Sequence, residues 1–308
     1  MKRIFFARII IGSLFATVAA GTWDAWWHGA LGRESFWSPP HLLMYSSVLV
    51  AIFVGWRAWY IFRDKLWRRS ALVLSLIPLS APIDDLWHRL FGVENIASPA
   101  IIWSPPHLLL IFGIIGTIAM ILPILKQDED RDAGRLFGSM SFGMILALLF
   151  FVAAPFEPIG PYHILGFWGA GIFAALLAGV FLLAGRWLPG LGGVTITATF
   201  FLLLSAIGFG EKISPNVIIE AHEHAPNWLT IFSVLAPASL LDLSKRLPPW
   251  TKGGVVGFLW ALLFYGVASY FFDPQFQYSI SQAVIAIIAG TIGGVLGSSI
   301  VYLKYPNR

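Results

Sequence analysis

The stretch PPHLLLIFGIIGTIAMILPIL, residues 105–125, carries no charged side chain along its whole length. About 20 consecutive apolar residues suffice for a helix to cross the hydrocarbon core of a bilayer. The stretch PPHLLMYSSVLVAIFVGWRAWYIF, residues 39–62, begins with the same three residues and is also long enough. These two runs predict membrane-spanning helices and therefore an all-α fold.

Similar apolar runs recur on both sides of these two, and the whole chain, 1–308, is predicted to form a single transmembrane domain of about ten helices. Prolines interrupt the third span at Pro78 and Pro82 and the eighth at Pro237, which membrane helices tolerate when neighbours satisfy the freed carbonyls. The predicted spans are 5–23, 39–62, 71–88, 105–125, 136–154, 162–185, 192–209, 226–241, 254–272 and 278–303.

The composition excludes an ordinary soluble domain. The chain is 57% hydrophobic and only 12% charged, against about 25% charged in soluble proteins, and too little polar surface would remain to cover so large an apolar core. Cysteine is absent, which excludes disulfides, thiolate metal sites and cysteine nucleophiles. A metal site in this chain must use histidines, carboxylates or carbonyls.

The N-terminal stretch MKRIFFARIIIGSLFATVAAG has the basic start and apolar run of a signal peptide. Polar residues with a plausible role follow it directly, at Asp24 and His28, so we expect a retained first helix.

The distribution of Lys and Arg predicts the orientation in the cell membrane, because cytoplasmic loops are enriched in these residues. If the N-terminus is cytoplasmic, all but Arg33, Arg89 and Lys212 of the 20 basic residues fall on the cytoplasmic side. Both termini are therefore predicted to be cytoplasmic. The basic residues are divided among short segments, so no nucleic-acid partner is expected.

The opposite, outer side is acidic and holds every histidine. An acidic face attracts cations. Its acidic residues are Asp24, Glu34, Asp84, Asp85, Glu94, Glu157, Glu211, Glu220, Glu223 and Asp273, and the histidines are His28, His41, His88, His107, His163, His222 and His224.

The ten spans form five predicted hairpins with internal repeats. The repeats at 5–62 and 71–125 are clear, 136–185 is faint, and 192–241 and 254–303 are degenerate. In the first two, Asp-x3-His is followed by Trp-Ser-Pro-Pro-His, and the second copy carries six extra residues between its histidines. The matching residues are Asp24 with Asp84, His28 with His88, and His41 with His107.

Asp24 and His28 are four residues apart and so share one helix face. Ser38 is suited to N-cap the next helix and Pro39 to its first position, which places His41 in the first turn. Two histidines and a carboxylate suit Fe(II), Cu(II) or Zn(II). The alternative is that these side chains only cap helices and hydrogen-bond loops.

The second repeat offers a parallel site at Asp84, His88 and His107, predicted to be the weaker because its histidines are farther apart in sequence. Asp84 precedes His88 by four residues and is the expected ligand. Asp85 faces another way on the helix, so we expect it to support the ligands rather than bind metal.

The segment Asp24-x3-His28-x4-Arg33-Glu34-x4-Pro39-x-His41 resembles the metal-site segment of the C subunit of particulate methane and ammonia monooxygenases. The departures are Ser-Pro-Pro-His in place of Thr-Pro-Ser-His, a second motif with Val93 where the arginine would stand, and more helices.

The resemblance implies a copper site at Asp24, His28 and His41, oxidation of a small apolar molecule, and partner membrane subunits. Iron and zinc are the alternatives to copper. Arg33 and Glu34 would orient the loop.

Other readings remain open. The same ligands would serve a transition-metal or solute transporter, a metal-delivery protein, or a non-catalytic assembly subunit, so whether the chain is an enzyme stays undecided. Weaker site candidates are Glu94, Glu157, His163, His222 and His224. The run Lys126–Asp132 is predicted to be a solvated cytoplasmic loop, and the GTIGG stretch at 290–294 to pack helices closely.

Overall fold

The computed structural model of the chain describes residues 3–31, 37–91, 99–158, 164–188, 190–208, 228–244, 247–268 and 279–304. The described residues form helices and the turns between them, without strands, so the predicted all-α class is confirmed. The chain divides into two units, Met1–Met144 with Leu203–Ala225, and Ile145–Leu202 with Pro226–Arg308.

Eight helical segments in the described part of the chain are long and apolar enough to cross a membrane. The protein is therefore a multi-pass membrane protein. The segments are Arg3–Asp24, Pro39–Phe62, Lys65–Phe91, Pro105–Leu125, Arg131–Phe156, Gly166–Trp187, Pro249–Val267 and Ile280–Lys304.

The other two predicted spans, 192–209 and 226–241, coincide with shorter apolar helices. Helices α9 (Gly193–Gly208) and α10 (Trp228–Leu243) have 16 residues each. At about 1.5 Å per residue such a helix is shorter than the roughly 30 Å hydrocarbon core. Their length therefore separates them from the other eight.

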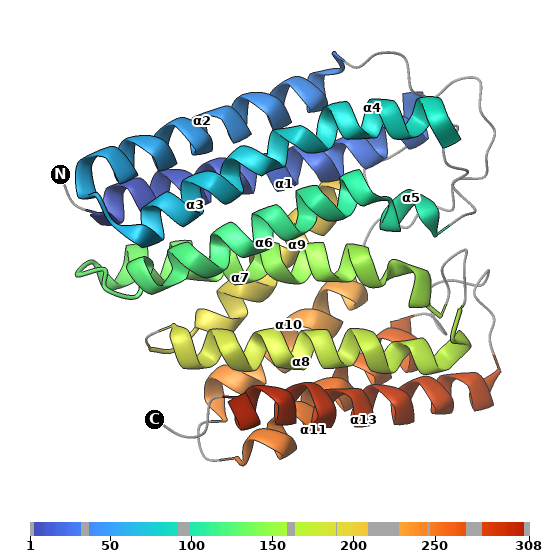
Figure 1. The fold of residues 1–308 in the computed structure, drawn as a ribbon. Coiled ribbons are helices and arrows are strands. Elements are labelled where there is room, and N and C mark those ends of the chain that lie inside the picture. Colours follow the sequence, from blue (N-terminus) through green and yellow to red (C-terminus); the bar gives the residue numbers. More distant parts are fainter. Residues whose placement is uncertain are drawn as a thin grey trace. The chain divides into compact units, whose positions relative to one another are not determined.

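The first unit is built on two helical hairpins that pack side by side (Figure 1). Helix α1 packs on α2 and α6, α2 packs on α3, and α6 packs on α3 and α4. The helices are α1 (Arg3–Leu31), α2 (Pro39–Phe62), α3 (Lys65–Leu76), α4 (Ser80–Phe91), α5 (Ala100–Trp103) and α6 (Pro105–Leu125), followed by the beginning of α7 (Arg131–Ala153).

The third predicted span holds both of its prolines without breaking. Pro78 lies in a 3₁₀ turn, η1 (Ile77–Leu79), which joins α3 directly to α4, and Pro82 lies near the start of α4. The tighter turn accommodates a proline, which has no backbone N–H to offer. Residues Lys65–Phe91 therefore run as one membrane-length segment.

A two-residue turn reverses the chain between α2 and α3. Arg63 adopts a left-handed conformation with φ 51°, and its N–H bonds to the carbonyl of Trp59 at 2.8 Å. The Asp64 side chain then accepts a bond from the N–H of Leu66 at 2.7 Å, which caps α3. The turn holds the two helices antiparallel.

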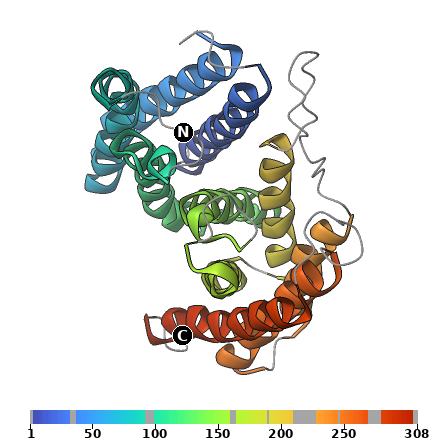
Figure 2. The same ribbon diagram turned by 90° about the vertical axis from the view of Figure 1, so that its right-hand side faces the viewer.

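The second unit is held together by glycines. Helix α13 (Ile280–Lys304), red in Figure 2, packs on α8 (Ala170–Trp187), which is yellow-green, and on α11 (Pro249–Ala261), which is orange. A side chain at Gly257 would overlap the carbonyl oxygen of Gly290, and one at Gly293 that of Gly171. The close packing predicted for the GTIGG stretch is confirmed.

Helices α9 and α10 are joined by one carboxylate in this unit. Asp242 accepts bonds from the N–H groups of Val194 at 3.2 Å and Thr195 at 2.9 Å, and from the Thr195 hydroxyl at 2.7 Å. Asp242, at the end of α10, thus satisfies the otherwise unpaired N–H groups that open α9.

Before α8 lie the 3₁₀ turns η2 (Ala154–Phe156) and η3 (Gly166–Gly169), and the π-helical turn η4 (Leu262–Ala268) extends α11.

Candidate metal centre

His41 occupies the position that the sequence predicts, in the first turn of α2. The helix begins at Pro39 with Ser38 as its N-cap residue, and only 9% of His41 is exposed. Its ring stacks on Tyr45, one turn further along, with the ring centroids 5.8 Å apart and the planes at 26°. The imidazole ring is thus packed on Tyr45 of the same helix and is largely shielded from solvent.

The end of α1 brings a carboxylate to this imidazole. Oδ1 of Asp24 lies 3.2 Å from Nε2 of His41, and both side chains are mostly buried. The two residues belong to different helices, so the α1–α2 packing itself brings them together. The first hairpin thus unites two of its three predicted ligands.

The second hairpin repeats this arrangement. Oδ1 of Asp84, on α4, lies 3.7 Å from Nε2 of His107, in the first turn of α6. Ser104 is the N-cap residue of α6 and two prolines follow it, as in α2. This pair is partly exposed, whereas the first is more deeply buried.

The six extra residues of the second repeat do not separate its carboxylate from its histidine. The short helix α5 (Ala100–Trp103) lies directly before Ser104, and the N–H groups of Ile102 and Trp103 bond back to Pro99 at 3.0 Å. This helical turn takes up chain length, because a helix advances only about 1.5 Å per residue.

The two adjacent carboxylates of α4 have different partners. Asp84 lies beside His107, whereas Asp85 forms an ion pair with Arg89 at 2.7 Å on the exposed face of the helix. In the structure Asp85 contacts Arg89, a residue outside the predicted ligand set.

The predicted third ligands lie on the described helices, but their side chains lie outside the described residues. His28 is in α1 and His88 in α4, each one turn after the aspartate of its hairpin. Also outside the described residues are Arg33, Glu34, Glu94, His163, His222 and His224. Glu157 directly follows η2 in the second unit.

Among the side chains that the structure describes, no group of three His, Asp or Glu gathers as a metal site would require. Each hairpin is thus described with one carboxylate and one imidazole. Two ligands of one tetrahedral ion, each about 2.0–2.2 Å from the metal, are about 3.4 Å apart. The observed separations of 3.2 Å and 3.7 Å lie on either side of this value.

Each candidate histidine is preceded, three positions earlier, by a serine for which sequence reasoning considered only a helix-capping role. Ser38 and Ser104 are buried, and neither hydroxyl has a hydrogen-bond partner among the described residues. The capping bond expected of Ser38 is not formed. Of the N–H groups that such a cap can bind, Pro40 at the second position of α2 has none, and that of His41 at the third position is not bonded by Ser38. The twofold occurrence of Ser-Pro-Pro-His was the signal that could have identified these hydroxyls.

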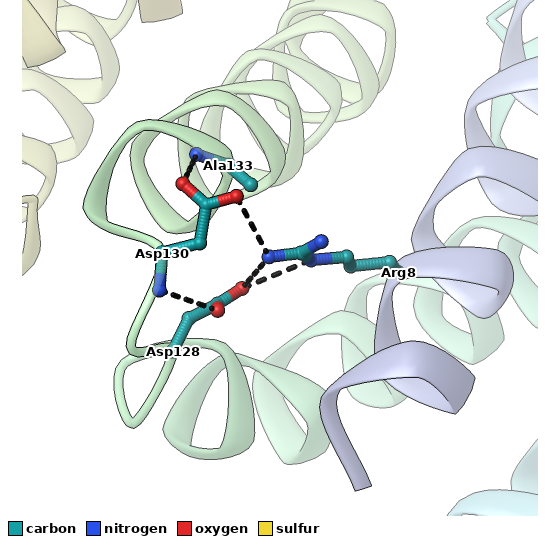
Figure 3. Close-up of polar contacts among 4 residues, drawn as sticks. All are labelled: Arg8, Asp128, Asp130 and Ala133. Atoms are coloured by element: carbon teal, nitrogen blue, oxygen red, sulfur yellow. Dashed lines mark hydrogen bonds and ion pairs between the residues drawn. The ribbon is translucent and has the colours of Figure 1, made fainter. Parts of the chain in front are cut away.

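A different charged cluster lies at the other end of the first unit (Figure 3). Nε and Nη2 of Arg8 donate to Oδ2 of Asp128 at 3.0 Å and 2.7 Å, and Asp130 lies 3.6 Å from Nη2. The Asp128 side chain is only 4% exposed. The prediction that Lys126–Asp132 is a solvated loop is therefore wrong for Asp128, because Arg8 of α1 covers it.

Family models, curated proteins and solved structures were all compared with this chain, and none matches it.

Proposed function

We propose that the chain is a membrane metalloprotein that binds one copper ion at Asp24, His28 and His41 and a second at Asp84, His88 and His107. In this proposal it acts in the manner of the copper membrane monooxygenases, oxidising a small apolar molecule. Bound copper would supply the redox chemistry. The protein's own residues hold the ion and shape the surroundings.

The observation that carries the proposal is the repeated contact between an aspartate and a helix-opening histidine. The separation of 3.7 Å between Asp84 and His107 is longer than a hydrogen bond between nitrogen and oxygen, yet it suits two ligands of one ion. Two hairpins with different loop lengths reach the same arrangement. A mere loop-capping role would not require it.

The pairing supports two separate centres rather than one shared centre. Each aspartate contacts the histidine of its own hairpin, Asp24 with His41 and Asp84 with His107. The residue four positions after each aspartate, His28 or His88, lies on the same helix face and would complete each set.

In this proposal the chain has ten spans in five hairpins with internal repeats. Both termini are cytoplasmic, and the metal centres lie at the outer face of the cell membrane. The excess of Lys and Arg on the cytoplasmic side supports this orientation. It does not depend on α9 and α10, since leaving out these two short helices removes an even number of crossings. The bilayer would deliver the apolar substrate, and partner membrane subunits would complete the enzyme.

The described polar side chains within the spans favour this reading over a transporter. Hydroxyls at mid-span donate to backbone carbonyl oxygens of their own helix, four residues earlier. The pairs are Thr17 with Ser13, Thr117 with Gly113 and Ser141 with Phe137. A transporter would instead place polar groups in broken helices near the bilayer centre.

The test is the metal content of the purified full-length protein after copper loading and removal of free ion. We expect about two copper ions per chain in the wild type and about one in His41→Ala or His107→Ala, because each centre keeps its own ligands. His163→Ala is the matched control and should retain both ions.

Equal copper content in the wild type and both variants would rule the sites out. If the protein carries copper into vesicles and no oxygen-dependent oxidation of an apolar substrate is observed, the protein is a transporter and not an enzyme.

A further inference from the structure

The end of the first unit opposite the candidate metal centres carries a dense group of basic side chains around the α2–α3 turn (Figure 1). All five are exposed, and they fall within thirteen positions of the chain. They are Arg57, Arg63, Lys65, Arg68 and Arg69.

These five charges have no carboxylate partner among the described residues. The one acidic residue in the same segment, Asp64, is engaged elsewhere. Its carboxylate pairs with Arg3 at 3.0 Å and caps α3 through the N–H of Leu66. The positive charge of the turn is therefore not neutralised by any carboxylate in the part of the chain that the structure describes.

Two of the arginines share one aromatic ring. The guanidinium carbon of Arg57 lies 5.6 Å from the centroid of the Tyr60 ring, and that of Arg63 lies 4.7 Å from the same centroid. Arg63 also lies 5.6 Å from the Trp59 ring. Cation–π contacts of this kind hold the side chains in place. The two guanidinium groups are thus positioned together without an anion.

Exposed aromatic side chains adjoin this pair on α2. Phe53 is 70% exposed and Tyr60 is 58% exposed, and with Arg57 they lie on one face of α2 at helical spacing. Arg57 is itself inside the span Pro39–Phe62. An exposed arginine in a span extends its guanidinium to the headgroup layer, where it needs an anion.

We propose that Arg57, Tyr60 and Arg63 form a binding site for the phosphodiester headgroup of an anionic lipid, with Lys65, Arg68 and Arg69 strengthening the attraction. Guanidinium groups bind phosphate oxygens through paired, charge-assisted hydrogen bonds. The adjoining apolar face of α2 accommodates the acyl chains. This site is independent of the proposed metal centres.

The experiment is native mass spectrometry of the full-length protein in detergent, titrated with phosphatidylglycerol or phosphatidylcholine. We expect the wild type to retain phosphatidylglycerol preferentially. Arg57→Gln and Arg63→Gln should each weaken its binding about fivefold, given the known attraction of one basic residue at an anionic surface. Tyr60→Leu should weaken it while all charges remain.

Arg131→Gln is the matched control, since Arg131 is an exposed arginine at the start of α7 among acidic residues. It should bind phosphatidylglycerol as the wild type does. Arg57→Lys with Arg63→Lys keeps the charge but removes the paired guanidinium hydrogen bonds, so it should weaken phosphatidylglycerol binding less than the glutamine changes do and more than Arg131→Gln does.

Three outcomes would overturn the proposal. The first is unchanged lipid preference in the two glutamine variants. The second is an equal loss in Arg131→Gln, which would indicate an unspecific charge effect. The third is displacement of the lipid by millimolar inorganic phosphate, which would identify a site for free phosphate.

Discussion

Nε2 of His41 lies 3.2 Å from Oδ1 of Asp24, although the two residues sit on different helices and the chain reverses direction between them. His107 and Asp84 have the same relationship in the second hairpin, at 3.7 Å. In both cases the opening turn of one helix meets the end of the preceding membrane-length segment. The hairpin is therefore the unit that builds each candidate centre.

Replacing the two adjacent carboxylates of α4 one at a time distinguishes the proposed metal ligand from the residue next to it. We expect Asp84→Asn to lose one bound copper ion, because Asp84 lies beside His107, and Asp85→Asn to keep both, because Asp85 pairs with Arg89. Elemental analysis of the purified variants measures the difference. Equal copper content in the two variants would argue against Asp84 as a ligand.

The orientation can be tested with single cysteines, since the chain has none of its own. Cysteines at Ser35 and at the exposed Glu129 should react with a membrane-impermeant maleimide from opposite sides. Glu129 is preferable to Asp128, whose side chain is buried against Arg8. Labelling of both positions from the same side would overturn the predicted topology.

Asp128→Asn should destabilise the first unit, because it leaves Arg8 without its closest carboxylate. Removing one partner of a buried ion pair costs about 3–5 kcal/mol, and we expect about 2 kcal/mol here because Arg8 is partly solvated. Thermal unfolding in detergent measures the change. Asp132→Asn is the control, since Asp132 is 93% exposed, and it should shift stability by less than about 0.5 kcal/mol. If both variants unfold alike, the ion pair contributes nothing specific.

Gly257→Ala should separate α11 from α13, because the added methyl group would overlap the carbonyl oxygen of Gly290. Overpacking of this kind costs about 1–3 kcal/mol. Gly21→Ala provides the comparison, since nothing lies within 4 Å of a side chain at that helical position. That variant should be neutral or more stable by up to about 1 kcal/mol. A destabilisation of Gly21→Ala as large as that of Gly257→Ala would contradict the packing argument.

Most of the fold could be predicted from the sequence. Apolar runs such as 105–125 specify a membrane helix, because lipid requires every backbone polar group to bond within its own segment. Each of the ten predicted spans overlaps a described helix. The ends of the third span were the exception, since 71–88 was predicted and the continuous segment runs from Lys65 to Phe91. Hydropathy marks apolar character more accurately than it marks helix ends.

The candidate site was predicted in its residue types and spacing, through the repeated Asp-x3-His and Ser-Pro-Pro-His motifs. Several features depended on the tertiary structure. These are the pairing of each aspartate within its own hairpin, the short helix α5 directly before Ser104, and the burial of Asp128 under Arg8. The physical reason is one of range. Hydropathy and capping are local properties of the chain, whereas the approach of two side chains across a hairpin is set by how the helices pack and how the loop closes.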